Sequence, residues 1–425
     1  MTLRSAILLL LLFASCALGA DKFVVREIRI SGLHRTRAWV VERELQFAAG
    51  DSVISADLMA ARRRIQNLSL FSDVRLSGDS SGVISVDHSE LWPLIPLLWM
   101  DFTEGQITDV LRHPDTFFDK VTLYAGALHL NIAGSGARIY AVGQFGAADG
   151  FELGFRTRWL SARWPLSLLL EIENQRVSDR HSAILDSARS LRIARYEMDV
   201  ATREGAPSRL GLLVKYQGVR QEKEWPAQGR HDVTAWFSPY VALDRRDLEW
   251  YPARGALVSA RTDVVTGSTF FVRSSCDLRG YFPLRDGARP PLLALRFAAA
   301  TSSNATPSWA HYYHGFNSGL RGYSTERSES AGFQTGGAEL RFPLTRETTY
   351  DLRWLGRYGR RLPWGVSGVL SVERGELLLD GRRLERLGFA AGLFLRFPYV
   401  EILEISAATD RDGSVEYLVN TGVHF

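Results

Sequence analysis

Residues 151–159 read FELGFRTRW, with Phe, Leu, Phe, Thr and Trp at the odd positions and Glu, Gly, Arg and Arg at the even ones. Successive side chains of a β-strand point to opposite faces, so this stretch has one largely apolar face and one polar face. The same period of two recurs from about residue 93 onward, in residues 166–173, 195–200, 210–217, 293–297 and 417–425. The last of these would place five residues on one face: Tyr417, Val419, Thr421, Val423 and Phe425.

A series of two-faced strands fits either a soluble β-sandwich or a membrane-spanning barrel. After residue 20 the chain has no apolar run of 18 residues, the length that a transmembrane helix needs. Strands cross a bilayer only as a closed barrel, because each unpaired backbone group there costs several kcal/mol. A sandwich rarely needs so many polar side chains on its inward face. The pattern therefore predicts an all-β transmembrane barrel over residues 91–425.

We predict about sixteen antiparallel strands, an even number as single-chain bacterial barrels have. A long connection, residues 303–331, follows the eleventh strand and is extracellular if the chain enters the barrel from the periplasm. The predicted strands are 94–102, 119–131, 136–146, 150–160, 164–175, 191–202, 208–219, 232–243, 255–265, 269–281, 291–302, 332–343, 364–375, 386–397, 400–409 and 415–425.

Residues 1–20 have the pattern of a cleaved signal peptide, with a positive charge at Arg4, a short apolar core and small residues before Asp21. This predicts export from the cytoplasm. Residues 13–16 also resemble a loose lipobox, which leaves open a lipidated N-terminus at Cys16. After cleavage at Ala20 only Cys276 remains, so the sequence predicts no disulfide framework and no cysteine-based metal site.

Residues 21–90 have a mixed α/β pattern in the order strand, helix, helix, strand, strand. Strands are predicted at 23–30, 71–76 and 83–86. Thr36 and Ser55 are the predicted N-caps of the two helices. In the second helix, one face is apolar and is predicted to pack in a core, through Leu58, Ala61, Ile65 and Leu68.

The formal net charge is +4, and four of the 51 basic residues are lysines. Acidic residues are interleaved with the arginines along the whole chain, so no basic stripe for nucleic acid occurs.

The order of elements in residues 21–90 resembles a POTRA domain, the periplasmic module of barrel-assembly and two-partner-secretion proteins. The matching stretches are 28–32 (IRISG), 50–51 (GD) and 67–74 (NLSLFSDV), of which the last is the most characteristic. The resemblance implies a single small POTRA-like domain in the periplasm.

Residues 94–425 contain four further stretches that resemble the BamA/TamA and two-partner-secretion transporter superfamily of outer-membrane barrels. Leu320, Arg321, Gly322 and Tyr323, preceded by Asn317–Gly319, are similar to its (V/L)RG(Y/F) loop motif. A turn motif D-x-R-D…P-x-x-G matches Asp244, Arg246, Asp247, Pro252 and Gly255. Residues 336–344 (GGAELRFPL) resemble the strand after the loop. Residues 420–425 (NTGVHF) resemble the C-terminal assembly signal, with Gly422 and Phe425.

The resemblance implies that the long loop folds back into the lumen and that Arg321 pairs with an acid on the inner wall. The family carries this acid in an F-x-D-x-G strand motif. Residues 371–375 (SVERG) have serine for the aromatic residue and glutamate for the aspartate, so Glu373 is the candidate partner. Glu339 or backbone carbonyls are the alternative.

The function that the resemblance implies is protein assembly or translocation at the bacterial outer membrane. Substrate strands would be engaged by the POTRA edge and by a seam in the barrel. The expected partners are outer-membrane lipid, unfolded polypeptides or a periplasmic accessory protein, and no nucleic acid. The alternative is a passive pore, or a lipid- or glycolipid-handling barrel on the same scaffold.

An enzyme is not expected. Residues 78–82 (GDSSG) match G-x-S-x-G in letters, but they lie in a predicted hairpin instead of the strand-to-helix turn that a nucleophile needs. His311 and His314 have no third metal ligand nearby in the sequence. No cofactor and no metal are expected.

Overall fold

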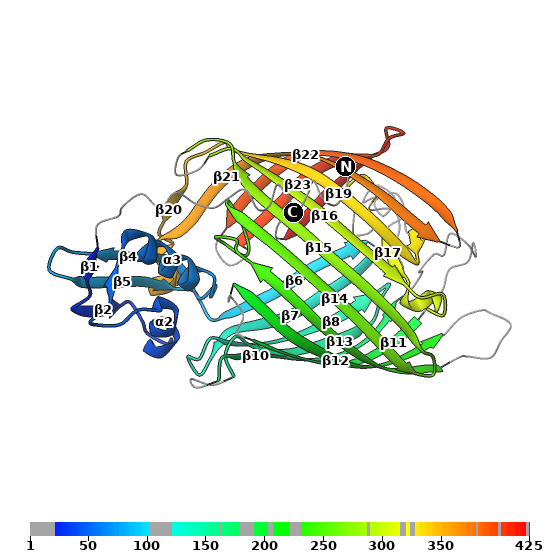
Figure 1. The fold of residues 1–425 in the computed structure, drawn as a ribbon, viewed down its shortest axis with the longest axis horizontal. Coiled ribbons are helices and arrows are strands. Elements are labelled where there is room, and N and C mark those ends of the chain that lie inside the picture. Colours follow the sequence, from blue (N-terminus) through cyan, green and yellow to red (C-terminus); the bar gives the residue numbers. More distant parts are fainter. Residues whose placement is uncertain are drawn as a thin grey trace.

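The structure is a computed structural model that describes residues 22–102, 121–160, 164–177, 191–202, 207–221, 231–286, 290–314, 320–323, 328–379, 381–397, 401–421 and 425. The predicted signal peptide with Cys16, residues 317–319 and Gly422 lie outside the described residues. A small N-terminal domain, drawn in blue, lies at one end of a large barrel (Figure 1).

The N-terminal domain is a three-stranded sheet with two helices. The sheet has the order β2-β5-β4, in which β2 and β5 are parallel and β4 and β5 are antiparallel. Buried side chains on α2, α3, β4 and β5 form one apolar core. The elements are β1 (Phe23–Val24), β2 (Glu27–Ser31), α2 (Ala38–Leu45), β3 (Ser52–Val53), α3 (Ser55–Gln66), β4 (Phe71–Gly78) and β5 (Val83–Glu90).

The predicted apolar face of α3 is confirmed, because Ala61 and Ile65 are buried and Leu58 packs against the core. Leu68 is also buried, but it lies two residues after the end of the helix. Both predicted N-caps are wrong. Thr36 precedes the N-cap Arg37, and its hydroxyl accepts a hydrogen bond from Asn131 of the barrel instead. Ser55 is the first helical residue, and the Asp57 carboxylate organises the helix start by accepting a bond from the Ile54 N–H at 2.9 Å.

Sixteen long antiparallel strands among the described residues form a closed barrel. Each overlaps one predicted range. They are β6 (Leu94–Phe102), β7 (Val121–Ile132), β8 (Ala137–Gly146), β9 (Gly150–Thr157), β10 (Leu166–Val177), β11 (Leu191–Thr202), β12 (Ser208–Gln221), β13 (His231–Asp244), β14 (Gly255–Gly267), β15 (Phe271–Pro283), β16 (Leu292–Ser302), β19 (Gly332–Pro343), β21 (Leu362–Leu379), β22 (Arg382–Phe397), β23 (Glu401–Thr409) and β24 (Val415–Thr421).

Shorter elements lie in the connections of the barrel. Between β16 and β19 are η2 (Ser308–Ala310) and the antiparallel pair β17 (Tyr312–His314) and β18 (Ser328–Ser330). Between β19 and β21 are β20 (Thr348–Tyr350), which pairs with the start of β21, and η3 (Arg353–Gly359).

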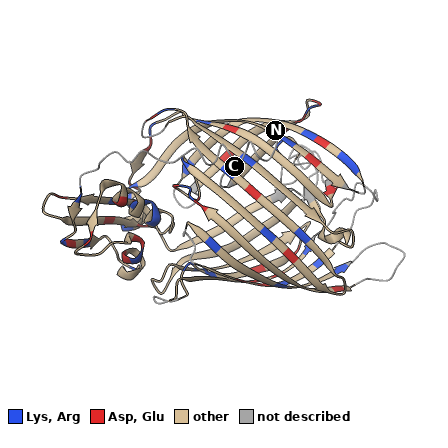
Figure 2. Ribbon diagram, in the orientation of Figure 1, with Lys and Arg blue, Asp and Glu red and all other residues tan. Residues whose placement is uncertain are grey.

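The two faces of the barrel strands have opposite chemistry. Large apolar side chains such as Tyr196 and Leu210 are 53% and 62% exposed, whereas Glu173 and Asp263 are buried. Charged residues of both signs are spread over the barrel strands (Figure 2). Apolar side chains outward and charged side chains inward are the arrangement of a barrel that is surrounded by lipid. No helix among the described residues is long and apolar enough to cross a membrane.

Hydrogen bonds and ion pairs fix the N-terminal domain against the barrel. The Arg37 N–H donates to the Gly134 carbonyl at 2.9 Å, in the turn between β7 and β8. Arg361, just before β21, lies 2.8 Å from Asp87 and 3.2 Å from Asp73. Partial burial raises the pKa of Asp87, but the bond and charge of Arg361 outweigh it, so this pKa lies below its ordinary value. The domain therefore contacts the barrel at several separate points.

Candidate functional site

The 320–323 segment lies inside the barrel against a wall made by the last strands. Strand pairing places Gly337 opposite Glu373 and Glu339 opposite Ser371, so both acids lie on the luminal face of neighbouring strands β19 and β21. Residues between them, such as Val372, are exposed on the outer face. The period of two thus aligns the luminal acids without any contribution from the loop.

Arg321 is 4% exposed and contacts three carboxylates. Its guanidinium lies 2.9 Å from Glu339, 3.0 Å from Glu373 and 3.0 Å from Glu404. It also donates to the Ser371 hydroxyl at 3.1 Å, and its backbone N–H donates to Glu373 at 3.2 Å. A buried guanidinium is tolerated only where such partners compensate its lost hydration. Arg321 therefore connects β19, β21 and β23 through one side chain.

The residues around Arg321 complete the attachment of the segment. Gly322 has φ +91°, where a Cβ would also lie 2.6 Å from the Thr409 carbonyl oxygen, and its N–H donates to Glu416 on β24 at 2.6 Å. The Tyr323 hydroxyl donates to the Leu387 carbonyl at 3.1 Å. Leu320 and Tyr323 are both buried. The segment is thus bonded to all of the last five long barrel strands, counting the contacts of Arg321.

Room for the segment comes from a glycine on the wall. At Gly388 on β22, a Cβ would clash with the backbone carbonyl of Arg321. Any larger side chain at this position would displace the segment.

Arg341 forms a second buried centre next to the first. Its Nε donates to Glu339 at 2.6 Å, so Glu339 lies between the two arginines. Its terminal nitrogens donate to the Pro252 carbonyl at 3.3 Å and to the backbone oxygen of Phe425 at 3.4 Å. Arg341 therefore connects the loop site, the turn after β13 and the last residue of the chain.

The turn between β13 and β14 is compact and holds the predicted turn residues together. The Arg246 guanidinium lies 2.6 Å from Asp244. The Asp247 carboxylate accepts hydrogen bonds from the N–H groups of Leu248, Ala253 and Arg254. Gly255 begins β14 and Pro252 provides the carbonyl for Arg341.

The predicted position of Phe425 is wrong. Tyr417 and Val419 face outward, at 79% and 68% exposure, but Phe425 is 1% exposed and packs in the lumen with Tyr281, Leu292 and Ala294. Its ring also lies 5.6 Å from the Arg321 guanidinium. The position of Phe425 is set by its luminal packing and by the bond from Arg341.

The structure brings Arg321 together with Glu373, the predicted partner, and with Glu339, the predicted alternative. Sequence reasoning missed Glu404, Glu416 and Arg341. Arg341 had a detectable signal, because it follows Glu339 by two residues and so shares its face. Glu404 and Glu416 had no comparable signal, because they lie on other strands far along the chain.

We expect Phe425→Ala to reduce assembly of the barrel, because it removes a fully buried ring that contributes about 1.5–3 kcal/mol. The measurement is the fraction of chain that shows heat-modifiable mobility in outer-membrane preparations. Val419→Ala on β24 is the matched control, since it removes an exposed apolar side chain. Equal assembly of Phe425→Ala and wild type would mean that the luminal packing of Phe425 is dispensable.

A closed, antiparallel barrel with apolar side chains outward and charged side chains inward is the arrangement of bacterial outer-membrane β-barrel proteins. Residues 131–354, more than half of the chain, match the family described as the Omp85 superfamily domain. The chain belongs to the Omp85 superfamily.

Solved structures support the same fold. BamA from Haemophilus ducreyi lacking POTRA domains 1–3 is similar at a TM-score of 0.56 and 12% identity, over 94% of this chain and 83% of that one. CdiB from Acinetobacter baumannii is similar at 0.57 and 12%, over 94% and 74%. CdiB from Escherichia coli is similar at 0.54 and 10%, over 97% and 92%. No match was found among curated protein sequences.

Proposed function

We propose that this protein inserts or exports polypeptides at the outer membrane, and that substrate strands pair with the barrel at the seam between β6 and β24. The observation that carries the proposal is the weakness of this seam. The two strands are neighbours in the closed sheet, and outward side chains on both of them, Leu98 and Tyr417, are unusually exposed. An incompletely paired strand edge is a template for an incoming strand.

Side-chain exposure supports a loosely closed seam. Leu98 on β6 is 80% exposed and Tyr417 on β24 is 79% exposed, more than outward-facing residues elsewhere such as Leu210 on β12 at 62%. In a continuous sheet, side chains of both neighbouring strands cover part of an outward side chain. Its exposed fraction is therefore high where the neighbouring strand on one side contributes little cover.

Pro96 lies in the middle of β6 and weakens the edge further. Proline has no N–H to donate, so within sheets it is confined to edge strands, strand starts and bulges. In this barrel β6 is continuously paired with β7, opposite Ala127, and its other side faces the seam. The residue type is consistent with a strand that serves as an edge.

The loop site would support the seam from inside. Glu416, which accepts the bond from Gly322, is on the seam strand β24, and Phe425 follows that strand. We therefore assign to Leu320, Arg321, Gly322 and Tyr323, with Glu373, the role of holding the last strands in place while β24 exchanges partners. The turn residues from Asp244 to Gly255 would support the same site through Arg341, which bonds Pro252, Glu339 and Phe425.

The N-terminal domain is proposed to be a POTRA domain in the periplasm. Apart from the two-residue strands β1 and β3, its order of elements is the one expected. The match to BamA extends over 94% of the chain, whereas residues 91–425 alone make up about four fifths of it. β4 is an edge strand of its sheet. Barrel residues Arg360 and Arg361 contact β4 at Ser72 and Asp73, so the part from Arg75 onward is the segment offered to a substrate or an accessory protein.

The test is photocrosslinking in cells from p-benzoylphenylalanine at Leu98 or Tyr417. We expect adducts with unfolded polypeptides, identified by mass spectrometry, at both seam positions. The matched control is the same probe at Leu210, which is exposed and outward-facing on β12, far from the seam in strand order. Adducts with lipid or lipopolysaccharide alone at all three positions would contradict the proposal and favour a pore or a lipid- or glycolipid-handling barrel.

A further inference from the structure

Among the described residues, three arginines form a row across neighbouring strands at one end of the barrel. Strand pairing places Arg176 on β10 directly opposite Arg192 on β11, and Arg192 directly opposite Arg220 on β12. Each is the second residue from the end of its strand. The side chains of Arg176 and Arg192 are each 40% exposed, and Arg220 is exposed as well. The row therefore presents guanidiniums to the surroundings of the barrel rim.

Strand alternation places the row on the outward face. Ile172, Tyr196 and Tyr216 lie four residues from the three arginines in their own strands, and they are 42%, 53% and 53% exposed. Residues four apart in a strand share a face and lie about 13 Å apart along it. Outward apolar and aromatic side chains form the lipid-facing band of a barrel and its interfacial girdle. The arginine row thus lies just beyond the lipid-facing band.

The row lies at the extracellular rim, an orientation that rests on the periplasmic position proposed above for the N-terminal domain. Arg37 of that domain bonds Gly134 in the turn between β7 and β8, so this turn is at the periplasmic end. From β8 to β12 the strands alternate in direction, so the end of β10, the start of β11 and the end of β12 lie at the opposite rim. Cations just beyond the girdle at that rim are level with the headgroups of the outer leaflet.

Asp149, in the turn between β8 and β9, holds two arginines of the row side by side. Its carboxylate lies 2.8 Å from Arg176 and 3.1 Å from Arg192. Arg192 also donates to the amide oxygen of Asn174 at 3.4 Å, and the Arg176 N–H donates to the Asp149 carbonyl at 2.7 Å. Side chains that are already positioned lose less freedom when a ligand binds. The row is therefore an ordered surface instead of a set of freely moving side chains.

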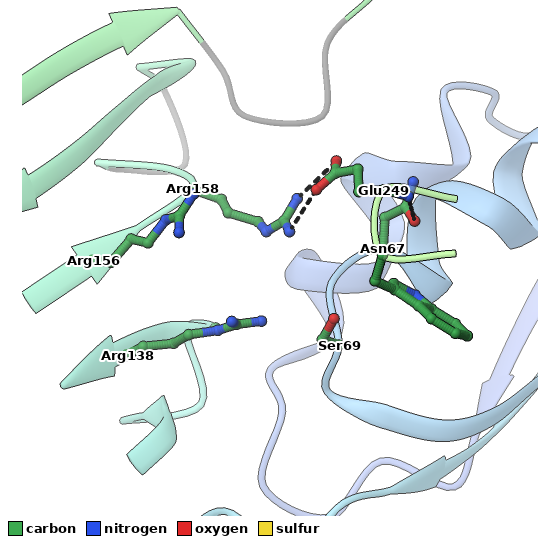
Figure 3. Close-up of a pocket in the computed structure, with 8 residues that line it drawn as sticks. Asn67, Ser69, Arg138, Arg156, Arg158 and Glu249 are labelled. Carbon is green, nitrogen blue, oxygen red and sulfur yellow. Dashed lines mark hydrogen bonds and ion pairs between the residues drawn. The ribbon is translucent and has the colours of Figure 1, made fainter. Parts of the chain in front are cut away.

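The position of the row distinguishes it from the arginines at the junction with the N-terminal domain. There Arg158 reaches Glu249 and Arg138 extends toward Ser69, in a cleft inside the molecule (Figure 3). Arg138 also donates to the Leu68 carbonyl at 3.0 Å. Those arginines connect two parts of the protein. The row at the rim is on the outer face, where a membrane lipid can reach it.

We propose that Arg176, Arg192 and Arg220 bind the phosphate groups of the glycolipid that forms the outer leaflet of the bacterial outer membrane. Guanidiniums bind phosphate through paired hydrogen bonds. Neighbouring strands are about 4.8 Å apart, so a headgroup with two phosphates can contact more than one arginine of the row. Its acyl chains would lie on the apolar band of β10–β12. The site matches the ligand in both parts, charge at the rim and apolar surface beneath it.

The experiment uses the full chain in dodecyl maltoside, with native mass spectrometry to count bound lipid. The probes are purified lipid A with two phosphates, the same lipid after dephosphorylation, and phosphatidylglycerol. We expect lipid A to be retained at the lowest concentration. Arg192→Gln and Arg220→Gln should each weaken its binding by about tenfold, the loss typical of one charge-assisted hydrogen bond. Each variant is first shown to keep heat-modifiable mobility, so that only assembled barrels are compared.

Arg374→Gln is the matched control, because Arg374 on β21 is 69% exposed, pairs with Glu385 at 3.2 Å and lies far from β10–β12 in strand order. It should bind lipid A as wild type does. The proposal is overturned if Arg192→Gln and Arg220→Gln retain lipid A like wild type, if the control loses as much as they do, or if dephosphorylated lipid or phosphatidylglycerol binds equally well. None of these readouts involves the seam, so a failure of the crosslinking test at Leu98 and Tyr417 would leave this site unaffected.

Discussion

Arg321→Ala is expected to release the 320–323 segment from the lumen and to lower the free energy of unfolding by about 3–5 kcal/mol, the range for removing one partner of a buried ion pair. The reason is that Glu339, Glu373 and Glu404 all lie within 3.0 Å of the guanidinium and are nearly inaccessible to solvent. Without the cation, three carboxylates remain close together in a site that is shielded from solvent.

Two measurements test this expectation: the temperature of the heat-modifiable mobility shift, and the sensitivity of residues 303–331 to trypsin. Arg374→Ala is the matched control, because Arg374 is the neighbour of Glu373 in the chain and forms an exposed pair with Glu385. Exposed pairs contribute about 0–1 kcal/mol. If Arg321→Ala leaves both measurements as in the control, the docking of the segment in the lumen is refuted.

The same two measurements, made on Glu373→Gln, test the role of Glu373. Arg321 contacts three acids and not one. Glu373→Gln is therefore expected to lower the free energy of unfolding by clearly less than Arg321→Ala does, and by less than it would if Glu373 were the sole partner. A double-mutant cycle between the two residues should still give a coupling energy beyond the 0.3–0.5 kcal/mol or so within which sites count as independent. A smaller coupling would leave Glu339 and Glu404 as the effective partners.

Arg341→Gln is the second change for which we expect a large effect, again about 3–5 kcal/mol. It leaves Glu339 without its 2.6 Å partner and removes the donors to Pro252 and Phe425. One substitution therefore loosens the turn after β13, the last residue and the acid shared with Arg321. We expect a lower yield of assembled barrel and a lower unfolding temperature.

Arg341→Lys is the control for Arg341→Gln. Lysine retains the charge but lacks the planar fork that reaches several acceptors, so an intermediate loss is expected. Equal stability of the glutamine variant and wild type, measured by urea titration of heat-modifiable mobility, would show that the three contacts of Arg341 do not contribute to assembly.

The local sequence pattern predicted the long strands of this protein, but the strand predicted at 23–30 is two strands, β1 and β2, which lie in different sheets. Alternation with a period of two located all sixteen long strands, because the pleat of a strand imposes that period wherever one face meets lipid and the other water. The helical period likewise identified Ala61, Ile65 and Leu68 as core residues. Helix starts were less predictable. The predicted N-cap Thr36 bonds Asn131 of the barrel instead of its own helix, and Asn131 lies nearly a hundred residues away in the chain.

The sequence by itself predicted the barrel and the α/β domain, and its loop motif singled out Arg321 as a site residue. Only the tertiary structure decided that Glu404 joins Glu373 at Arg321, with β22 lying between their strands, and that Phe425 turns into the lumen. Periodicity tells which face a residue occupies, since backbone geometry sets it locally. Which luminal side chains meet depends on how the closed sheet staggers its strands and on the path of a loop, and neither is encoded within any one strand.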